Sequence, residues 1–254
     1  MAQRSISELK LAAKPRERCA DCAIRHRAVC TYCSTSELDI LDAIKTYRNF
    51  APGQEIVAAG EETSFLGSVV EGVVSLSKTM ADGRRQMVGL MFASDFIGRP
   101  MSPIAPYDAV AITPVRLCLF TRARFERLLR ETPALEKRLL EMALDELDAA
   151  RDWMLLLGRK TAREKIASFL VILARRAAAL TGAAAENGLK LQLPLTREQM
   201  ADYLGLTIET VSRQITALRK AGVIQLDDAR HVTVLDYASL LDLASEDSDG
   251  GMIA

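Results

Sequence analysis

The spacing of apolar and polar residues changes along the chain and separates two kinds of structure. From Phe50 to Phe120, short apolar runs are divided by glycines that lie five to eleven residues apart, which is typical of the short strands of a β-roll or barrel. After Pro133 no glycine occurs for 24 residues, and this pattern predicts one long helix. A short helix over Ser36–Thr46 and a second apolar helix over residues 161–181 are also expected.

The long helix carries an apolar stripe with a seven-residue repeat, here named the dimer seam. Its members are Leu140, Ala143, Leu147, Ala150, Met154 and Leu157. This spacing corresponds to the a and d positions of a coiled coil. A helix that packs on its own domain would show the same repeat, but charged residues at the remaining positions favour a seam that a second subunit covers. The sequence therefore predicts a parallel homodimer.

Residues 195–235 contain the clearest local motif, a helix-turn-helix. Thr196 opens a capping box at the start of a short helix, Ala201 leaves room for a crossing helix, and Gly205 supplies the turn between the two. The second helix follows Thr207, whose hydroxyl can cap it. Two short apolar runs after this helix predict a hairpin wing.

The second helix of this motif presents side chains that suit the edges of DNA bases. They are Thr207, Glu209, Thr210, Ser212 and Arg213. An arginine can bond guanine O6 and N7 together, and a glutamate can accept from cytosine N4. A three-helix packing motif without nucleic acid is the alternative, and Gln214 occupies a position where the motif needs an apolar residue. The cap, the turn, the other apolar positions and the wing nevertheless favour a DNA-binding motif. We therefore expect double-stranded DNA as the partner, with the second helix in the major groove.

The patterns divide the chain into four parts. We expect a Cys-rich segment and β-roll over residues 1–132, a dimerisation helix over 133–158, a DNA-binding domain over 159–245 and a disordered acidic tail over 246–254. The net charge is zero, which excludes no partner because binding depends on where charge lies. Six basic residues precede the motif and are expected to contact phosphates: Arg159, Lys160, Arg163, Lys165, Arg175 and Arg176.

Five cysteines are unevenly placed: Cys19, Cys22, Cys30, Cys33 and Cys118. The chain has no run of ~18 apolar residues and no secretory signal, so we expect a protein of the reducing cytoplasm, where disulfide frameworks are unusual. Thiolate ligands for a metal or a cluster are the better interpretation. The first four cysteines could hold Zn²⁺ as paired CxxC motifs, although that use leaves Cys118 without a role. Two histidines in no catalytic pattern argue against an enzyme.

The order of β-roll, long helix and winged helix-turn-helix resembles the superfamily of the cyclic-AMP receptor protein and the fumarate-and-nitrate-reduction regulator (CRP/FNR). This resemblance implies an α+β fold with an N-terminal jelly-roll sensor domain, a coiled-coil dimerisation helix and a C-terminal winged helix-turn-helix. Glu209, Ser212 and Arg213 look like the E-x-x-S-R recognition helix of the oxygen-sensing branch. In that branch these residue types read a palindromic TTGAT-type site.

The cysteines are similar to the ligand set of a [4Fe–4S] cluster in the alphaproteobacterial members of that branch. The resemblance assigns the cluster to Cys19, Cys22, Cys30 and Cys118, with Cys33 as an alternate ligand. It implies an activator that responds to oxygen and touches RNA polymerase through the hairpin at Met80–Arg85, for which a solvated turn without a partner is the alternative. A zinc-stabilised or cluster-free regulator of the same family, responding to another signal, is the alternative.

A cyclic nucleotide is not expected as a ligand. Family members that bind cyclic AMP carry a Gly-Glu pair and an arginine in their phosphate-binding stretch. Here no glutamate follows Gly98, and Asp108 is expected to repel a phosphate.

Overall fold

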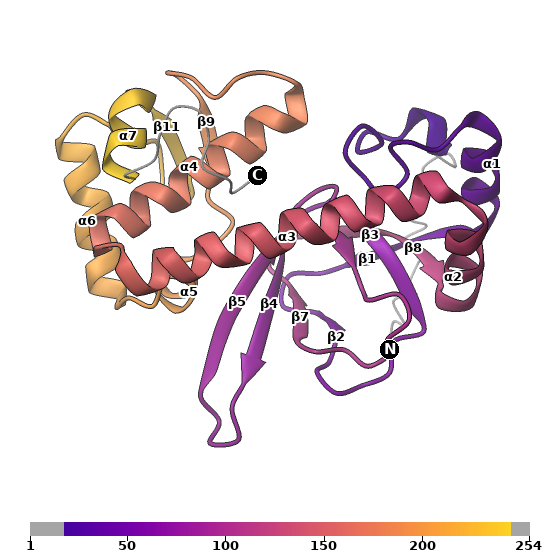
Figure 1. Cartoon of the computed structure of the whole chain (residues 1–254). Helices are drawn as coiled ribbons and strands as arrows, with labels where there is room; N and C mark the ends of the chain where they lie inside the picture. Colours follow the sequence, from indigo (N-terminus) through magenta and orange to yellow (C-terminus); the bar gives the residue numbers. More distant parts are fainter. Residues whose placement is uncertain (1–17, 245–254) are drawn as a thin grey trace, which may run out of the picture.

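The computed structural model describes residues 18–244 (Figure 1), and the predicted acidic tail lies outside them. The N-terminal half is a roll of two four-stranded antiparallel sheets with the orders β1-β8-β3-β6 and β2-β7-β4-β5. The strands are β1 (Lys45–Phe50), β2 (Glu55–Val57), β3 (Phe65–Glu71), β4 (Val74–Thr79), β5 (Arg85–Met91), β6 (Phe96–Ile97), β7 (Asp108–Ala111) and β8 (Val115–Thr121). Apolar side chains of both sheets, such as Val69 and Val74, form one buried core. The predicted β-roll is confirmed.

Two positions in the roll require glycine, one for a close approach of strands and one for a turn. Gly67 of β3 lies opposite Leu119 of β8, and a Cβ at Gly67 would stand 2.3 Å from the Cys118 carbonyl oxygen. Only glycine allows this approach of the two strands. Gly83 has a φ of 86° at the tip of the β4–β5 hairpin, which confirms the predicted turn.

Three helices flank the roll. Helix α1 (Thr35–Ile44) begins at Ser34, which forms a capping box with Glu37, and ends before the predicted Thr46 because Lys45 and Thr46 pair with β8 as the start of β1. Helix α2 (Arg122–Glu131) is followed by the long helix α3 (Pro133–Arg159). Figure 1 shows α3 passing along the roll and reaching the C-terminal half. No helix among residues 18–244 is long and apolar enough to cross a membrane.

The C-terminal half is a winged helix-turn-helix. Its elements are α4 (Ala162–Thr181), β9 (Lys190–Gln192), α5 (Arg197–Leu204), α6 (Ile208–Lys220), β10 (Ile224–Leu226), β11 (His231–Val234) and α7 (Tyr237–Ala244). The predicted wing is confirmed, but β9 joins it as a third strand in the order β10-β11-β9. Neither β9 nor α7 is predicted from the sequence. One apolar cluster contains side chains of α4, α5 and α6 together with Leu156 of α3.

Candidate functional site

The helix-turn-helix is built by local hydrogen bonds that the sequence predicts. The Thr196 hydroxyl accepts from the Gln199 amide at 3.1 Å while the Gln199 side chain accepts from the Thr196 amide at 2.8 Å. Gly205 ends α5 in the left-handed region with a φ of 61°. Thr207 caps α6 by accepting from the Thr210 amide at 3.2 Å.

Helix α6 has one buried face and one exposed face. Val211, Ile215 and Leu218 are buried against the domain core. Ile215 therefore takes the place in the core that the usual motif spacing would give to Gln214, which is only half-buried. The opposite face carries the five predicted DNA contacts, of which Thr210 is half-buried and the others exposed: Thr207, Glu209, Thr210, Ser212 and Arg213.

Hydrogen bonds already order part of this face. Arg213 Nη2 donates to Thr210 Oγ1 at 3.0 Å, and the Thr207 and Thr210 hydroxyls are 3.1 Å apart. Hydrogen bonds from its own backbone amide and from Thr207 hold the pKa of Glu209 below its usual value. Glu209 is thus a carboxylate acceptor at neutral pH, as contact with a cytosine amino group requires.

Among the six predicted phosphate-binding residues, Lys160, Lys165 and Arg176 bind specific groups of the folded chain. Lys160 Nζ donates to Ser168 Oγ at 2.7 Å and to the Ala244 carbonyl at 2.8 Å. Buried Lys165 donates to the Leu204 carbonyl at 3.2 Å, and Arg176 is ion-paired with Asp95 at 2.8 Å. The two lysines link helices and Arg176 links α4 to the loop before β6, which corrects their interpretation as phosphate contacts.

Other basic side chains remain available to phosphates. Arg159 and Arg163 are exposed as predicted. Arg219 and Lys220 are also exposed and were not predicted, although two basic residues in the last turn of a recognition helix could have indicated phosphate contacts.

The five cysteines gather in one apolar cluster, here named the thiol pocket. Cys19, Cys33 and Cys118 are buried, and Cys22 and Cys30 are half-buried at its edge. Burial raises the pKa of the Cys118 thiol, and three neighbouring thiols raise it further: Cys19, Cys22 and Cys30. Strand β8 thus carries Cys118 to the segment that holds the other four.

Burial is also the largest cause of the raised pKa values of Cys30 and Cys33. It raises the pKa of Cys30 to about 12, with contributions from Cys19, Cys33 and Cys22. It raises the pKa of Cys33 to about 11, with Glu37 adding to the rise. Among residues 18–244, no three side chains of His, Cys, Asp or Glu are arranged to hold a single metal ion.

The thiol pocket rests against the first turns of α3. Arg138 Nη2 donates to the Arg27 carbonyl at 2.9 Å, and the Lys137 ammonium lies 5.3 Å from the centre of the Tyr32 ring. Leu139 and other apolar side chains of α3 pack on the cluster that contains the thiols. The Cys-rich segment is therefore in direct contact with the helix that carries the dimer seam.

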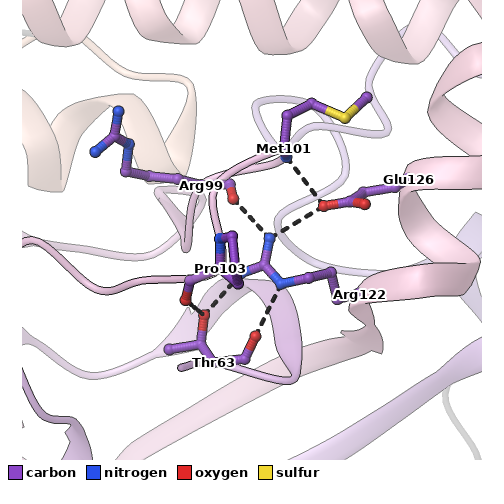
Figure 2. A network of polar contacts seen from close by, with 6 residues as sticks. All are labelled: Thr63, Arg99, Met101, Pro103, Arg122 and Glu126. Carbon is purple, nitrogen blue, oxygen red and sulfur yellow. Dashed lines mark hydrogen bonds and ion pairs between the residues drawn. The ribbon is translucent and has the colours of Figure 1, made fainter. Parts of the chain in front are cut away.

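A polar network closes the loop after β6 (Figure 2). Arg122 donates to the Arg99 carbonyl at 2.7 Å and to the Thr63 carbonyl at 2.8 Å, and Glu126 accepts from the Met101 amide at 3.0 Å. A hollow beside this loop is lined by residues that include Arg99, and Asp108 is not among them. Asp108 accepts from the Ala59 amide at 2.8 Å, and the expected repulsion of a phosphate by Asp108 stays a prediction.

Two family descriptions match the chain: a cyclic nucleotide-binding domain over residues 47–132 and a Crp-like helix-turn-helix domain over residues 164–243. The "Transcriptional activator protein FnrL" of Cereibacter sphaeroides is 57% identical over 92% of this chain and 95% of its own length. The "Nitrogen fixation regulation protein FixK" of Bradyrhizobium diazoefficiens is 40% identical over 89% and 94%. The structure of FixK2 from Bradyrhizobium japonicum superposes with a TM-score of 0.72 at 32% identity, covering 81% of this chain and 100% of that one.

The chain belongs to the CRP/FNR family of transcriptional regulators. Its relatives are DNA-binding regulators rather than enzymes, and the family acts as dimers. The predicted family and fold class are thereby confirmed. The prediction that no cyclic nucleotide binds stays a prediction.

In a CRP/FNR dimer, an apolar stripe on the long helix is the surface expected to meet its copy. The seam residues Leu140, Ala143, Leu147, Ala150 and Met154 are exposed in the single chain. Leu157 differs, because it is half-buried and packs on the cluster of its own DNA-binding domain. Exposed Leu144 and Leu155 widen the stripe, and the distance of four residues from Leu140 to Leu144 was the signal that could have indicated the first.

The two halves of this regulator also touch away from α3. Gln86 Nε2 of β5 donates to the Asp202 carbonyl of α5 at 2.7 Å. Met87 is buried in the cluster of the DNA-binding domain, and the Arg176–Asp95 ion pair joins α4 to the loop before β6. The roll therefore helps to position the helix-turn-helix.

Proposed function

We propose that this CRP/FNR regulator is an oxygen-responsive transcriptional activator of the cytoplasm that carries a [4Fe–4S] cluster and binds a palindromic TTGAT-type site as a homodimer. The ligands in this proposal are Cys19, Cys22, Cys30 and Cys118. The observation that carries it is the position of Cys118, a residue of β8 that lies in the same buried cluster as the three others. A fourth thiolate that comes from far along the chain is compatible with such a cluster.

The chemistry of the donor set fits this group. Buried thiols resist ionisation, as the raised pKa values of Cys30 and Cys118 indicate, and bound iron supplies the positive charge that makes the thiolates stable. Cys33 would be a spare thiol beside Cys30. When bound, the cluster supplies an oxygen-labile crosslink between the Cys-rich segment and β8.

The contacts of the pocket suggest how its state reaches the DNA. The Cys-rich segment is tied to α3 through Arg138 and Tyr32, and α3 carries the dimer seam. Ligation would hold this segment against α3 and support the geometry in which two subunits pair. Two paired subunits present two copies of α6 to the two halves of a palindrome.

The recognition face and the hairpin complete the proposal. Glu209, Ser212 and Arg213 would read bases, with Thr207 and Thr210 positioning the start of α6. The tip of the β4–β5 hairpin projects from the roll (Figure 1) and exposes Met80. We assign this tip to contact with RNA polymerase.

Purification without oxygen tests the proposal. We expect brown protein with about four iron and four sulfide per chain, as a [4Fe–4S] cluster requires, and loss of the colour in air. Replacement of any proposed ligand by serine should abolish the colour, whereas Cys33→Ser is the matched control and should keep it. Colourless protein with stoichiometric zinc would support the zinc alternative. If Cys33→Ser loses iron and Cys30→Ser retains it, the ligand is Cys33 and the spare thiol is Cys30.

A further inference from the structure

A buried lysine lies beside one of the proposed cluster ligands. Lys45 is the first residue of β1, and its side chain is only 2% exposed, which is rare for lysine. Its Nζ lies 3.4 Å from the Cys19 sulfur and 2.6 Å from Asp42 Oδ1. The same Asp42 oxygen accepts from the Cys19 amide at 3.0 Å. Hydrogen bonds therefore link the lysine, the aspartate and the cysteine to one another at the edge of the thiol pocket.

We propose that Lys45 is a positioning residue for the cluster: its ammonium donates to the ligated Cys19 thiolate and slows oxidation of the cluster by dioxygen. This inference rests on the proposed function, because it requires a cluster on Cys19. The structure gives the geometry on the protein side alone, namely a cation already directed at the sulfur.

Charge is the physical reason for the effect. Four thiolates bring more negative charge than the iron–sulfide core neutralises, and the pocket around them is apolar. Hydrogen bonds to ligand sulfurs and nearby charges set the reduction potential of such clusters. When dioxygen takes up one electron to give superoxide, the cluster loses that electron and becomes more positive. A neighbouring ammonium opposes this change, so Lys45 makes the first oxidation less favourable.

Asp42 has the opposite influence. Its carboxylate accepts from the Lys45 ammonium at 2.6 Å and from the Cys19 amide at 3.0 Å. The aromatic face of Tyr47, 5.3 Å from Lys45 Nζ, is a further neighbour of the cation. Removal of the Asp42 charge leaves the ammonium in place and less neutralised. Removal of Lys45 and removal of the Asp42 charge should therefore shift the reduction potential of the cluster in opposite directions. A purely structural role for the pair does not predict opposite shifts.

The experiment compares Lys45→Met and Asp42→Asn with the wild type, with Lys78→Met as the control because Lys78 is exposed on β4. The readouts are the midpoint potential of the bound cluster and the rate at which its absorbance is lost in air. We expect Lys45→Met to lower the midpoint potential and to lose absorbance about tenfold faster. The factor of about ten corresponds to the loss of one hydrogen bond to a charged group. We expect Asp42→Asn to raise the potential and slow the loss, and Lys78→Met to match the wild type.

Each outcome has a distinct meaning. Unchanged potentials and rates in both variants, with a cluster present, would refute the role of Lys45 and leave the proposed function standing. Shifts of the same sign would refute it as well, since they indicate a structural pair. If Lys45→Met does not fold, Asp42→Asn alone decides, because asparagine can still accept from the Cys19 amide. Wild-type protein without iron and sulfide would refute both proposals.

Discussion

The dimer seam gives a quantitative prediction, because the single chain leaves its residues exposed to different degrees. Met154 is 72% exposed and Leu147 46% exposed. Burial of a whole side chain of this size stabilises by about 1.5–3 kcal/mol. In a symmetric dimer each substitution removes this burial free energy twice, because both subunits contribute the residue. Met154→Ala should therefore cost about 3 kcal/mol of dimer stability, or about 100-fold in Kd, and Leu147→Ala about 2 kcal/mol, or about 30-fold.

Leu157 provides the internal control for this ordering. Its side chain already packs on its own domain, so Leu157→Ala should lower the free energy of unfolding of the chain by about 2 kcal/mol or more and change the dimer Kd by less than the other two substitutions. Sedimentation equilibrium of protein purified without oxygen gives the three Kd values, and denaturant unfolding gives the stabilities. If Leu157→Ala weakened the dimer as much as Met154→Ala without loss of stability, the placement of Leu157 in the structure would be wrong. A wild-type Kd for Met154→Ala would remove this stripe from the interface.

Three further predictions concern readout, the switch and the contact between the halves. Arg213→Ala should cost about 1–3 kcal/mol on a TTGAT-type duplex and relax choice at one base pair, whereas Arg163→Ala should weaken matched and scrambled DNA alike; a uniform loss for Arg213→Ala in gel-shift titrations would show that it reads no base. Wild-type apo-protein should still dimerise at micromolar concentration. Ala150→Asp should shift the apo-protein towards monomer while the cluster-bound form still dimerises, because two carboxylates would face each other across an apolar seam. If the variant and the wild type sediment alike, Ala150 does not belong to the seam. Arg176→Met should lower the free energy of unfolding by about 1–3 kcal/mol, since it leaves the partly buried carboxylate of Asp95 without its ion pair; an unchanged denaturation midpoint would contradict this.

The elements that the sequence predicts well are those fixed by neighbours in the chain. The capping box at Thr196 and the turn at Gly205 depend on hydrogen bonds and a φ angle within a few residues, so residue types suffice. The hairpin tip at Gly83 follows the same rule. The long helix α3 (Pro133–Arg159) is also predicted well, because an uninterrupted helical pattern follows Pro133.

The errors arise where a distant segment decides. Lys160 and Lys165 look like phosphate contacts in a row of basic residues, but carbonyl groups of Ala244 and Leu204 bind them. Residues 190–192 are too few to predict a strand and become one because β11 offers its edge. Lys45 faces the thiol pocket only because β1 pairs with β8 in the register that sets Tyr47 opposite Cys118. None of these partners can be identified from spacing along the chain.

The position of the Cys-rich segment explains how one short stretch can influence both halves of the regulator. Its Arg27 accepts from Arg138 of α3 through the carbonyl. Burial and the nearby Arg176 guanidinium lower the pKa of the Arg27 side chain, while Asp95 opposes that shift. Arg27 therefore lies within electrostatic reach of the ion pair that joins α4 to the roll. A movement of this segment would change its contacts with the dimerisation helix and the electrostatic interaction of Arg27 with the Arg176–Asp95 ion pair.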